Sequence, residues 1–496
     1  MYLLGVDIGT TNWKANLYDY NGKLIASAKI PTKVNKDKFG DYYNPYILWK
    51  SFSQLTREIL SKIKSPSSIK ALSIASMAEA GLIIDKFGKP IYHIIPWYDK
   101  RTVKQKEWLE KKISKSNIFK ITGLNLTYIF SALKIQWLKE NVKRDFTRSS
   151  KWLCIPDFLN YKLTGEFATD YSIACRTALF DIKLKKWSKL MLDILEIKEN
   201  FLPKTFPSGT VIGNITPKAS EETGLTTSTR VVLGGHDHLC GSIGAGILEE
   251  GSLLDSIGTA ESIVTVMHNL KCMNKIYKSG FSVGCYPYKE LYYIMSGIYY
   301  SGGLIEWFIR EFCNKNLDKE KIYNKLIKDA EKSKTGSNGI IVFPHWLGST
   351  IPYRNLNSKG AILGLTPTVT KNDILNGIFE GLSFEFKQLL EVMEDTIDIK
   401  LNKIIVIGGG SKNKIWLKRK SNILGKRLIV PHINEAVSLG ASLLAGIGIK
   451  DIKRPDDIIK NFNRKLIYPD KYSKKIYDNI YKIRDKILKW KVDLPS

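Results

Sequence analysis

The stretch LLGVDIGTT at residues 3–11 is echoed by LLDSIGTA at residues 253–260, which places Gly258 and Thr259 in the register of Gly9 and Thr10. Each copy has the pattern of an apolar strand ending in a glycine-threonine turn, and such a turn offers backbone N–H groups and hydroxyls to a phosphate. A plain strand and β-turn would fit either copy alone. Because each copy opens about half of the chain, the pair predicts a duplicated fold whose halves clamp one polyphosphate.

An acid in the first copy separates the two repeats. Asp7 precedes the first glycine-threonine turn and is placed to hold a cation, whereas the second copy has no acid in this register. A cation shared by the two halves is therefore expected to be held mainly by the first half.

A second carboxylate follows another strand-like run, VVLGGHDHLCGSIGAG at residues 231–246. The apolar run ends in two glycines, Asp237 stands between two histidines, and small residues that can begin a helix follow. This pattern places Asp237 at a strand end facing a cleft. A hairpin tip with a solvated aspartate fits these residues equally well when they are taken alone.

A third glycine loop lies in IIVIGGGSKNKIW at residues 404–416. A strand, a glycine loop and a helix together let the backbone approach a nucleotide closely and point a helix N-terminus at it. The loop has neither the GxGxxG spacing of a dinucleotide fold nor the GxxxxGK[ST] pattern of a P-loop, which disfavours both classes of enzyme.

Composition limits the remaining classes of protein. A length of 496 residues favours two large domains. Apolar residues make up 44% of the chain, but they form no uncharged run as long as a membrane span needs. The N-terminus has no basic segment typical of a secretory signal, and the six cysteines are scattered singly, so a cytoplasmic protein with reduced thiols is expected. The net charge of +28 is spread along the chain, so it favours nucleic-acid binding only if the basic residues cluster on one face. Residues 464–491 are expected to form one or two solvated helices.

As an ordered set, these motifs resemble the FGGY carbohydrate kinases. The similarity runs from residue 3 to about residue 446 through DIGTT, the acid of GGHDH, SIGTA, GGGSKN, and then ILG at 423–425 and SLGAS at 438–442. Three further segments are similar to the family: residues 75–91, PWYDKRT at 96–102, and residues 156–181 with their LTG and TD pairs. The resemblance implies an α/β fold of the two-domain, actin-like (ribonuclease-H-like) ATPase type. Residues 1–245 would bind sugar and supply the base, residues 246–496 would bind ATP, and the substrates would meet in the interdomain cleft.

The resemblance also assigns roles to single residues. Asp237 matches the general base that takes the proton from the attacking hydroxyl, and Asp7 matches the acid on the Mg²⁺ side. Glu79 and Trp97 match the sugar-binding carboxylate and indole. The positions that match the ATP site are Thr10, Thr11, Gly258, Thr259, Gly302, Gly409, Gly410 and Asn413.

Several positions depart from particular branches of the family. Ala78 and Ile129 stand where glycerol kinases carry arginine and tyrosine, and SMAEAG at 76–81 lacks the histidine of xylulokinases. His236 and His238 are more similar to the fuculokinase-like branch. KRKSN at 418–422 departs from the family pattern in the nucleotide helix.

The expected function is ATP-dependent phosphorylation of a hydroxyl of a sugar, ketose or polyol, with a xylulokinase- or fuculokinase-type kinase as the narrower alternative. An inactive actin-like sensor of nucleotide or sugar is the alternative from another class. The expected partners are ATP, Mg²⁺ and a small sugar or polyol, without nucleic acid or membrane, and a homodimer is compatible with the sequence.

Overall fold

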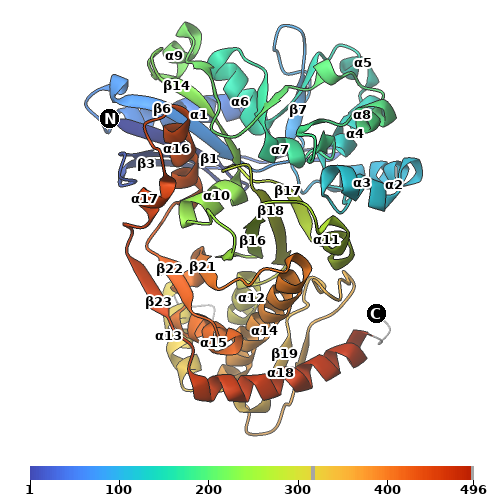
Figure 1. The fold of residues 1–496 in the computed structure, drawn as a ribbon, viewed down its shortest axis with the longest axis vertical. Helices are drawn as coiled ribbons and strands as arrows, with labels where there is room; N and C mark the ends of the chain where they lie inside the picture. Colours follow the sequence, from blue (N-terminus) through green and yellow to red (C-terminus); the bar gives the residue numbers. More distant parts are fainter. Residues whose placement is uncertain (314–318, 493–496) are drawn as a thin grey trace.

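Two sheets, one from each half of the chain, organise the computed structural model, which describes residues 1–313 and 319–492 (Figure 1). The first sheet has six strands in the order β13-β14-β6-β1-β2-β3. Its strands are β1 (Tyr2–Ile8), β2 (Asn12–Tyr18), β3 (Leu24–Pro31), β6 (Ile69–Ser76), β13 (Val211–Asn214) and β14 (Arg230–His236). β1 is buried along almost its whole length, as its continuous apolar run predicts.

The second sheet has seven strands in the order β17-β18-β16-β15-β21-β22-β23. They are β15 (Ser252–Ile257), β16 (Glu261–Met267), β17 (Ser282–Cys285), β18 (Tyr292–Ile298), β21 (Lys403–Ile407), β22 (Leu428–Pro431) and β23 (Arg464–Ile467). The two sheets share one pairing pattern. In the first sheet, β1 pairs antiparallel with β2 and β2 with β3, while β6 and then β14 lie parallel on the other side of β1. In the second sheet, β15 pairs antiparallel with β16 and β16 with β18, while β21 and then β22 lie parallel on the other side of β15. The duplication predicted from the repeated glycine-threonine turns is therefore confirmed, and the fold is the two-domain actin-like α/β fold.

Helices cover the two sheets and fill the space between them (Figure 1). The first half contains α1 (Pro45–Leu60), α2 (Val103–Lys112), α3 (Lys115–Thr122), α4 (Ser131–Asn141), α5 (Lys143–Phe146), α6 (Ile155–Thr164), α7 (Tyr171–Cys175), α8 (Lys189–Leu195), α9 (Pro217–Thr223) and α10 (Asp237–Ala245). The second half contains α11 (Met273–Ser279), α12 (Gly302–Phe312), α13 (Lys319–Glu331), α14 (Lys371–Ile397), α15 (Lys414–Leu424), α16 (Ala436–Gly448), α17 (Pro455–Ile459) and α18 (Lys471–Val492).

Five two-stranded sheets complete the strand pairing. They pair β4 (Asn35–Asp37) with β5 (Gly40–Tyr42), β7 (Gly81–Ile84) with β8 (Lys151–Cys154), β9 (Ala168–Asp170) with β12 (Lys204–Phe206), β10 (Phe180–Asp181) with β11 (Lys186–Trp187), and β19 (Ile341–Phe343) with β20 (Ala361–Leu363).

Helices α10 and α16 cross between the two sheets, and glycines allow the close approach. A Cβ atom on Gly440 of α16 would lie 1.8 Å from the Cys240 carbonyl oxygen of α10, and one on Gly5 of β1 would lie 1.9 Å from the Ser438 carbonyl oxygen. The Ser438 hydroxyl also accepts a 2.7 Å hydrogen bond from the Asn16 side chain of β2. The SLGAS segment thus packs on the first sheet although it lies in the second half of the chain, and the division at residue 245 stays a prediction.

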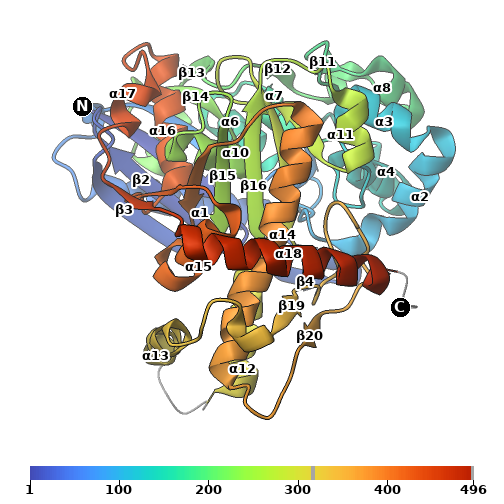
Figure 2. The same ribbon diagram turned by 60° about the horizontal axis from the view of Figure 1, so that its bottom comes forward.

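The C-terminal region differs from the expectation of solvated helices. Arg464–Ile467 forms β23 at the edge of the second sheet, and α18 then lies across α15 and α14 (Figure 2). The side chains of Tyr477 and Arg484 in α18 are fully buried. The many lysines of this segment hid its buried face, which consists of Tyr477, Leu488 and the paired Arg484.

Two predictions from composition can be compared with the structure. All six cysteines are free, and four of them are buried, as packing residues would be. Within the described ranges, no helix has both the length and the apolar character required of a membrane span.

Candidate active site

The carboxyl ends of three parallel strands meet at one edge of the first sheet and position the acids of the site. Ile8 of β1 and His236 of β14 both lie opposite Ser76 of β6. Asp7, Glu79 and Asp237 are each within three residues of this row, so the fold brings together three acids that are far apart in the sequence.

Asp237 is the first residue of α10, directly after β14. Its carboxylate oxygen Oδ1 accepts a 2.7 Å hydrogen bond from the His238 backbone N–H and lies 3.2 Å from Nε2 of His236. The Asp237 side chain keeps 21% of its surface exposed, whereas the His236 side chain keeps 6%. Burial lowers the pKa of His236 well below its usual range, so this imidazole is neutral. A partly exposed carboxylate held at a strand end can reach a bound hydroxyl.

Asp7 is a buried carboxyl beside Asp237. Burial, and secondarily the negative charge of Asp237, raise the pKa of Asp7 to about 7, while the positive charge of Lys14 opposes the rise. Lys14 lies opposite Asp7 on β2 and forms a 2.8 Å ion pair with Glu435. Two neighbouring carboxyls with incomplete charge compensation favour a cation between them and the phosphates.

Glu79 is buried and is paired with an arginine that was not predicted from the sequence. Its oxygen Oε1 accepts a 2.6 Å hydrogen bond from Nε of Arg176 and lies 2.6 Å from Nη2 in the same ion pair. Glu79 has a φ of 62°, a strained value for a side chain of this size. Arg176 caps the end of α7 and also lies near the hydroxyl of Tyr293 on β18. One sign of this buried arginine was present in the sequence, because Arg176 is the only charged residue in the small and apolar run ACRTALF.

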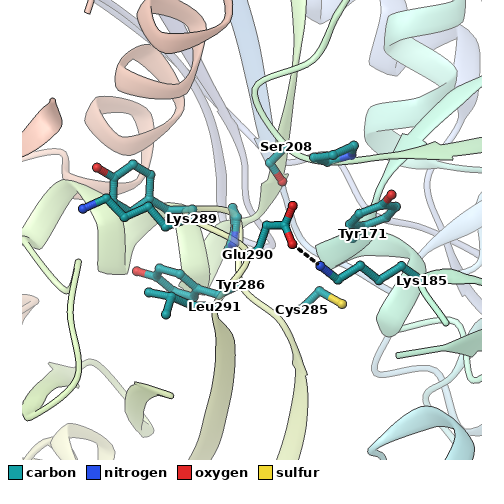
Figure 3. A pocket seen from close by; sticks show the side chains of 11 residues that line it. Tyr171, Lys185, Ser208, Cys285, Tyr286, Lys289, Glu290 and Leu291 are labelled. Carbon is teal, nitrogen blue, oxygen red and sulfur yellow. Dashed lines mark hydrogen bonds and ion pairs between the residues drawn. The ribbon is translucent and has the colours of Figure 1, made fainter. Parts of the chain in front are cut away.

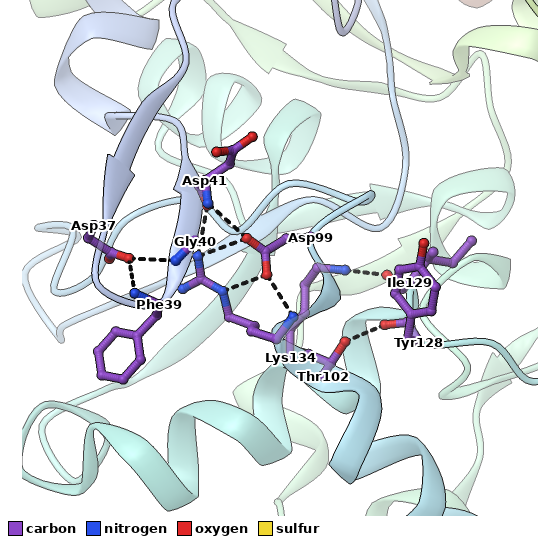
Figure 4. Close-up of polar contacts among 10 residues, drawn as sticks. Asp37, Phe39, Gly40, Asp41, Asp99, Thr102, Tyr128, Ile129 and Lys134 are labelled. Atoms are coloured by element: carbon purple, nitrogen blue, oxygen red, sulfur yellow. Dashed lines mark hydrogen bonds and ion pairs between the residues drawn. The ribbon is translucent and has the colours of Figure 1, made fainter.

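Trp97 contacts the first glycine-threonine turn, because its indole Nε1 donates a 3.1 Å hydrogen bond to the Thr10 hydroxyl. The segment after it is anchored by Asp99, which accepts hydrogen bonds from Arg101 and from the Asp41 backbone N–H (Figure 4). The buried Lys134 ammonium donates to the Ile129 carbonyl in the same region. This bond fixes the backbone at the position where glycerol kinases carry tyrosine.

The two glycine-threonine turns lie at matching places in the two sheets. Thr10 and Thr11 are exposed between β1 and β2, and Gly258 and Thr259 are exposed between β15 and β16. Gly302 begins α12, and its backbone N–H donates a 3.0 Å hydrogen bond to the Gly258 carbonyl. A Cβ atom on Gly302 would lie 2.4 Å from that carbonyl oxygen, so only glycine fits against the second turn.

The third glycine loop lies beside the second turn, because β21 pairs parallel with β15. Gly409 and Gly410 begin a short 3₁₀ turn over residues 409–412, and a Cβ atom on Gly410 would lie 2.3 Å from the Ile257 side chain. Asn413 is fully buried and caps α15 by accepting a 3.0 Å hydrogen bond from the Trp416 backbone N–H. If Asn413 contributes to a nucleotide site, it therefore does so by holding the N-terminus of α15 in place.

A buried ion cluster behind the second turn was also missed. The Lys420 ammonium of α15 donates 2.7 Å hydrogen bonds to Asp255 and to Glu261, and all three side chains are fully buried. Glu261 accepts a further 2.6 Å bond from the Ser301 hydroxyl at the start of α12. The cluster thus connects the segments on both sides of the turn to α12 and α15. This ion cluster explains why a lysine stands at position 420, within the KRKSN segment that departs from the family pattern.

A cavity of about 150 Å³ lies elsewhere between the two halves of the chain (Figure 3). Tyr171, Lys185 and Ser208 line it from the first half, and residues 285–291 line it from the second half. Lys185 and Glu290 form a 2.9 Å ion pair in it. None of the site residues predicted from the sequence lines this cavity.

Comparisons with known proteins agree with this arrangement. The profile of the FGGY family of carbohydrate kinases, N-terminal domain, matches residues 2–244, and that of the C-terminal domain matches residues 256–449. A xylulose kinase of Staphylococcus xylosus is 25% identical over 97% of this chain and 98% of the relative, and a glycerol kinase of Clostridium beijerinckii is 28% identical over 97% and 96%. The crystal structure of a xylulose kinase from Rhodospirillum rubrum has the same fold, with a TM-score of 0.90 at 20% identity over 98% of both chains.

The two family profiles together cover most of the chain, in the order in which the two sheets occur. The chain therefore belongs to the FGGY family of carbohydrate kinases, phosphotransferases that use ATP to phosphorylate a hydroxyl group of a sugar or polyol.

Proposed function

We propose that Asp237 is the general base of this kinase. The observation that carries the proposal is the placement of its partly exposed carboxylate at the start of α10, beside Asp7 and at the edge shared by β1, β6 and β14. Phosphoryl transfer depends mainly on positioning and charge neutralisation, so one carboxylate aimed at the attacking hydroxyl is a sufficient protein contribution to proton transfer.

The proposed division of labour follows the two sheets. Residues 1–245 bind the sugar through Glu79 and Trp97, and residues 246–496 bind most of the nucleotide. The exposed Thr10, Thr11, Gly258 and Thr259 turns provide hydroxyls and backbone N–H groups for the phosphates, and the glycine loop at 408–410 allows close approach of the nucleotide. Asp7 fits Mg²⁺, because a divalent cation would offset the burial and the repulsion from Asp237 that raise the pKa of Asp7. When bound there, Mg²⁺ would neutralise charge on the transferred phosphoryl group.

The narrower proposal for the substrate is a ketose of the xylulose or fuculose type. Ala78 and Ile129 remove two polar side chains expected of a glycerol site, and Arg176 occupies one oxygen of Glu79. The other oxygen of Glu79 and the Trp97 ring then provide one acceptor and one apolar face.

The proposed cellular setting is the cytoplasm, with a sugar and ATP as the partners and without nucleic acid. A homodimer is compatible with this proposal.

A coupled assay of ADP release tests the proposed function directly. The purified chain is supplied with Mg²⁺-ATP and, in turn, with pentuloses, hexuloses, deoxyketoses and polyols. We expect turnover far above the background ATPase rate with at least one ketose and little with glycerol. Turnover with no compound would favour the inactive actin-like sensor, although the presence of both Asp7 and Asp237 disfavours that reading. Turnover mainly with glycerol would contradict the ketose proposal alone.

A further inference from the structure

Two histidines flank Asp237, and phosphoryl transfer does not require either of them. His236, Asp237 and His238 each direct a potential metal-ligand atom into one small region, and these three atoms lie within 4.8 Å of one another. The rings of His236 and His238 are 5.3 Å apart at an interplanar angle of 63°. Two imidazoles and a carboxylate thus converge where β14 passes into α10.

The burial of these side chains suits a preformed site that is open on one side. His236 is buried, Asp237 is half-buried and His238 is exposed. Nδ1 of His236 has no hydrogen-bond partner among the residues that the structure describes. Nε2 of His236 lies 3.2 Å from the Asp237 carboxylate oxygen, which favours a hydrogen on Nε2 in the metal-free chain. An ion bound at Nε2 beside this oxygen would replace that hydrogen and leave the ring hydrogen on Nδ1.

The ligand types select the class of cation. Two imidazoles and one carboxylate, with a remaining position for water, are a common protein ligand set for Zn²⁺ and similar transition-metal ions. Mg²⁺ prefers oxygen ligands and keeps several waters, so it suits Asp7 and phosphate oxygens better than this cluster. The neighbouring Asp7 carboxyl adds negative charge that favours a cation here.

We propose that His236, Asp237 and His238 form a binding site for a transition-metal ion such as Zn²⁺, and that occupancy of this site inhibits the kinase. A carboxylate bound to the metal is unavailable to take a proton from the sugar hydroxyl, and the ion also occupies the space in front of it. The inhibition rests on the proposed role of Asp237 as base, whereas the binding of the metal does not.

The test uses the full chain and Zn²⁺ as the probe, with calorimetry for binding and steady-state turnover for inhibition. His238→Ala removes an exposed ligand, so it is expected to leave the fold intact. His268→Ala is the matched control, because His268 is an exposed histidine whose hydrogen bond to Glu250 is made by its backbone N–H. Cys272→Ser/Cys313→Ser tests the half-buried thiols as competing ligands.

We expect one Zn²⁺ to bind per chain, with affinity lowered at least tenfold in His238→Ala and unchanged in His268→Ala and in the cysteine variant. Zn²⁺ should inhibit turnover in proportion to occupancy, and His238→Ala should be correspondingly resistant. Equal Zn²⁺ affinity in His238→Ala and the unmodified chain would overturn the site. Stoichiometric binding that is lost in His238→Ala but causes no inhibition would support the metal site and overturn its inhibitory role. Turnover of Asp237→Asn, measured separately, decides whether Asp237 is the base.

Discussion

The buried pair of Glu79 and Arg176 allows a prediction whose size follows from the structure. Oε1 of Glu79 accepts a 2.6 Å hydrogen bond from Nε of Arg176 and forms an ion pair with Nη2 at 2.6 Å, and the Glu79 and Arg176 side chains keep only 6% and 8% of their surface exposed. Removing one partner of such a pair leaves an uncompensated buried charge, which typically costs about 3–5 kcal/mol. We therefore predict that Glu79→Ala and Arg176→Met each lower the free energy of unfolding by about this amount.

The double variant distinguishes the ion pair from two independent side chains. With both charges removed, no buried charge is left without a partner, so the double variant should be destabilised by clearly less than the sum of the two single variants. Urea unfolding at neutral pH measures all three free energies, provided that the slope with urea concentration stays constant. Single effects below about 1 kcal/mol, or additive effects in the double variant, would refute this reasoning.

Glu290 offers a matched control. It also has a positive φ, of 54°, and is paired with Lys185 at 2.9 Å, but its side chain is 82% exposed. Glu290→Ala should change the free energy of unfolding little, because solvent screens exposed ion pairs. For sugar binding, Glu79→Gln is the better variant than Glu79→Ala, because it keeps the shape of the side chain. It should weaken the binding of the sugar found in the ADP-release screen by about 1.5–3 kcal/mol, with little change in ATP affinity.

Three further predictions concern the metal, the phosphates and a buried lysine. Asp7→Ala should reduce turnover severely and change its Mg²⁺ dependence while circular dichroism stays unchanged, and normal activity would exclude the proposed role. Thr259→Val should raise the KM for ATP more than the KM for sugar, and equal changes in both constants would argue against a phosphate contact. Complete burial lowers the pKa of Lys134 from its ordinary 10.5 to about 8, so between these pH values the unfolded chain binds a proton that the folded chain has lost. The free energy of unfolding should accordingly gain up to about 3 kcal/mol from Lys134 as pH rises from 8 to 10.5, and Lys134→Met should lack this gain in urea unfolding. The same pH dependence in both proteins would contradict the assignment.

The fold could be predicted from the sequence wherever local patterns repeat or end sharply. The glycine-threonine turns marked equivalent strands in two sheets, and the small residues after Asp237 marked the start of α10. The packing of α16 on the first sheet was not predictable from its own sequence. It depends on the close backbone contact between Gly5 of β1 and Ser438 of α16, and Gly440 of α16 allows a similar contact with Cys240 of α10. In both contacts the partner lies far away in the sequence.

The site was predictable to the extent that its residues lie in motifs. Asp7 lies near the end of a recognisable strand, Glu79 and Asp237 follow such strands, and the structure gathers the three acids at one sheet edge. Arg176 and Lys420 were missed because a charged residue in a local sequence gives no sign of its burial or of a partner far away. Arg176 pairs with a residue 97 positions away, and Lys420 pairs with residues 159 and 165 positions away.

The central claim, that Asp237 is the general base, is tested most directly by comparing turnover with binding in Asp237→Asn. The substitution keeps the shape of the side chain and removes its ability to accept a proton in the transition state. We predict that kcat falls by at least about 10²-fold, while calorimetric affinities for sugar and ATP change far less. Near-normal kcat in the purified Asp237→Asn variant would show that another group accepts the proton and would contradict the account.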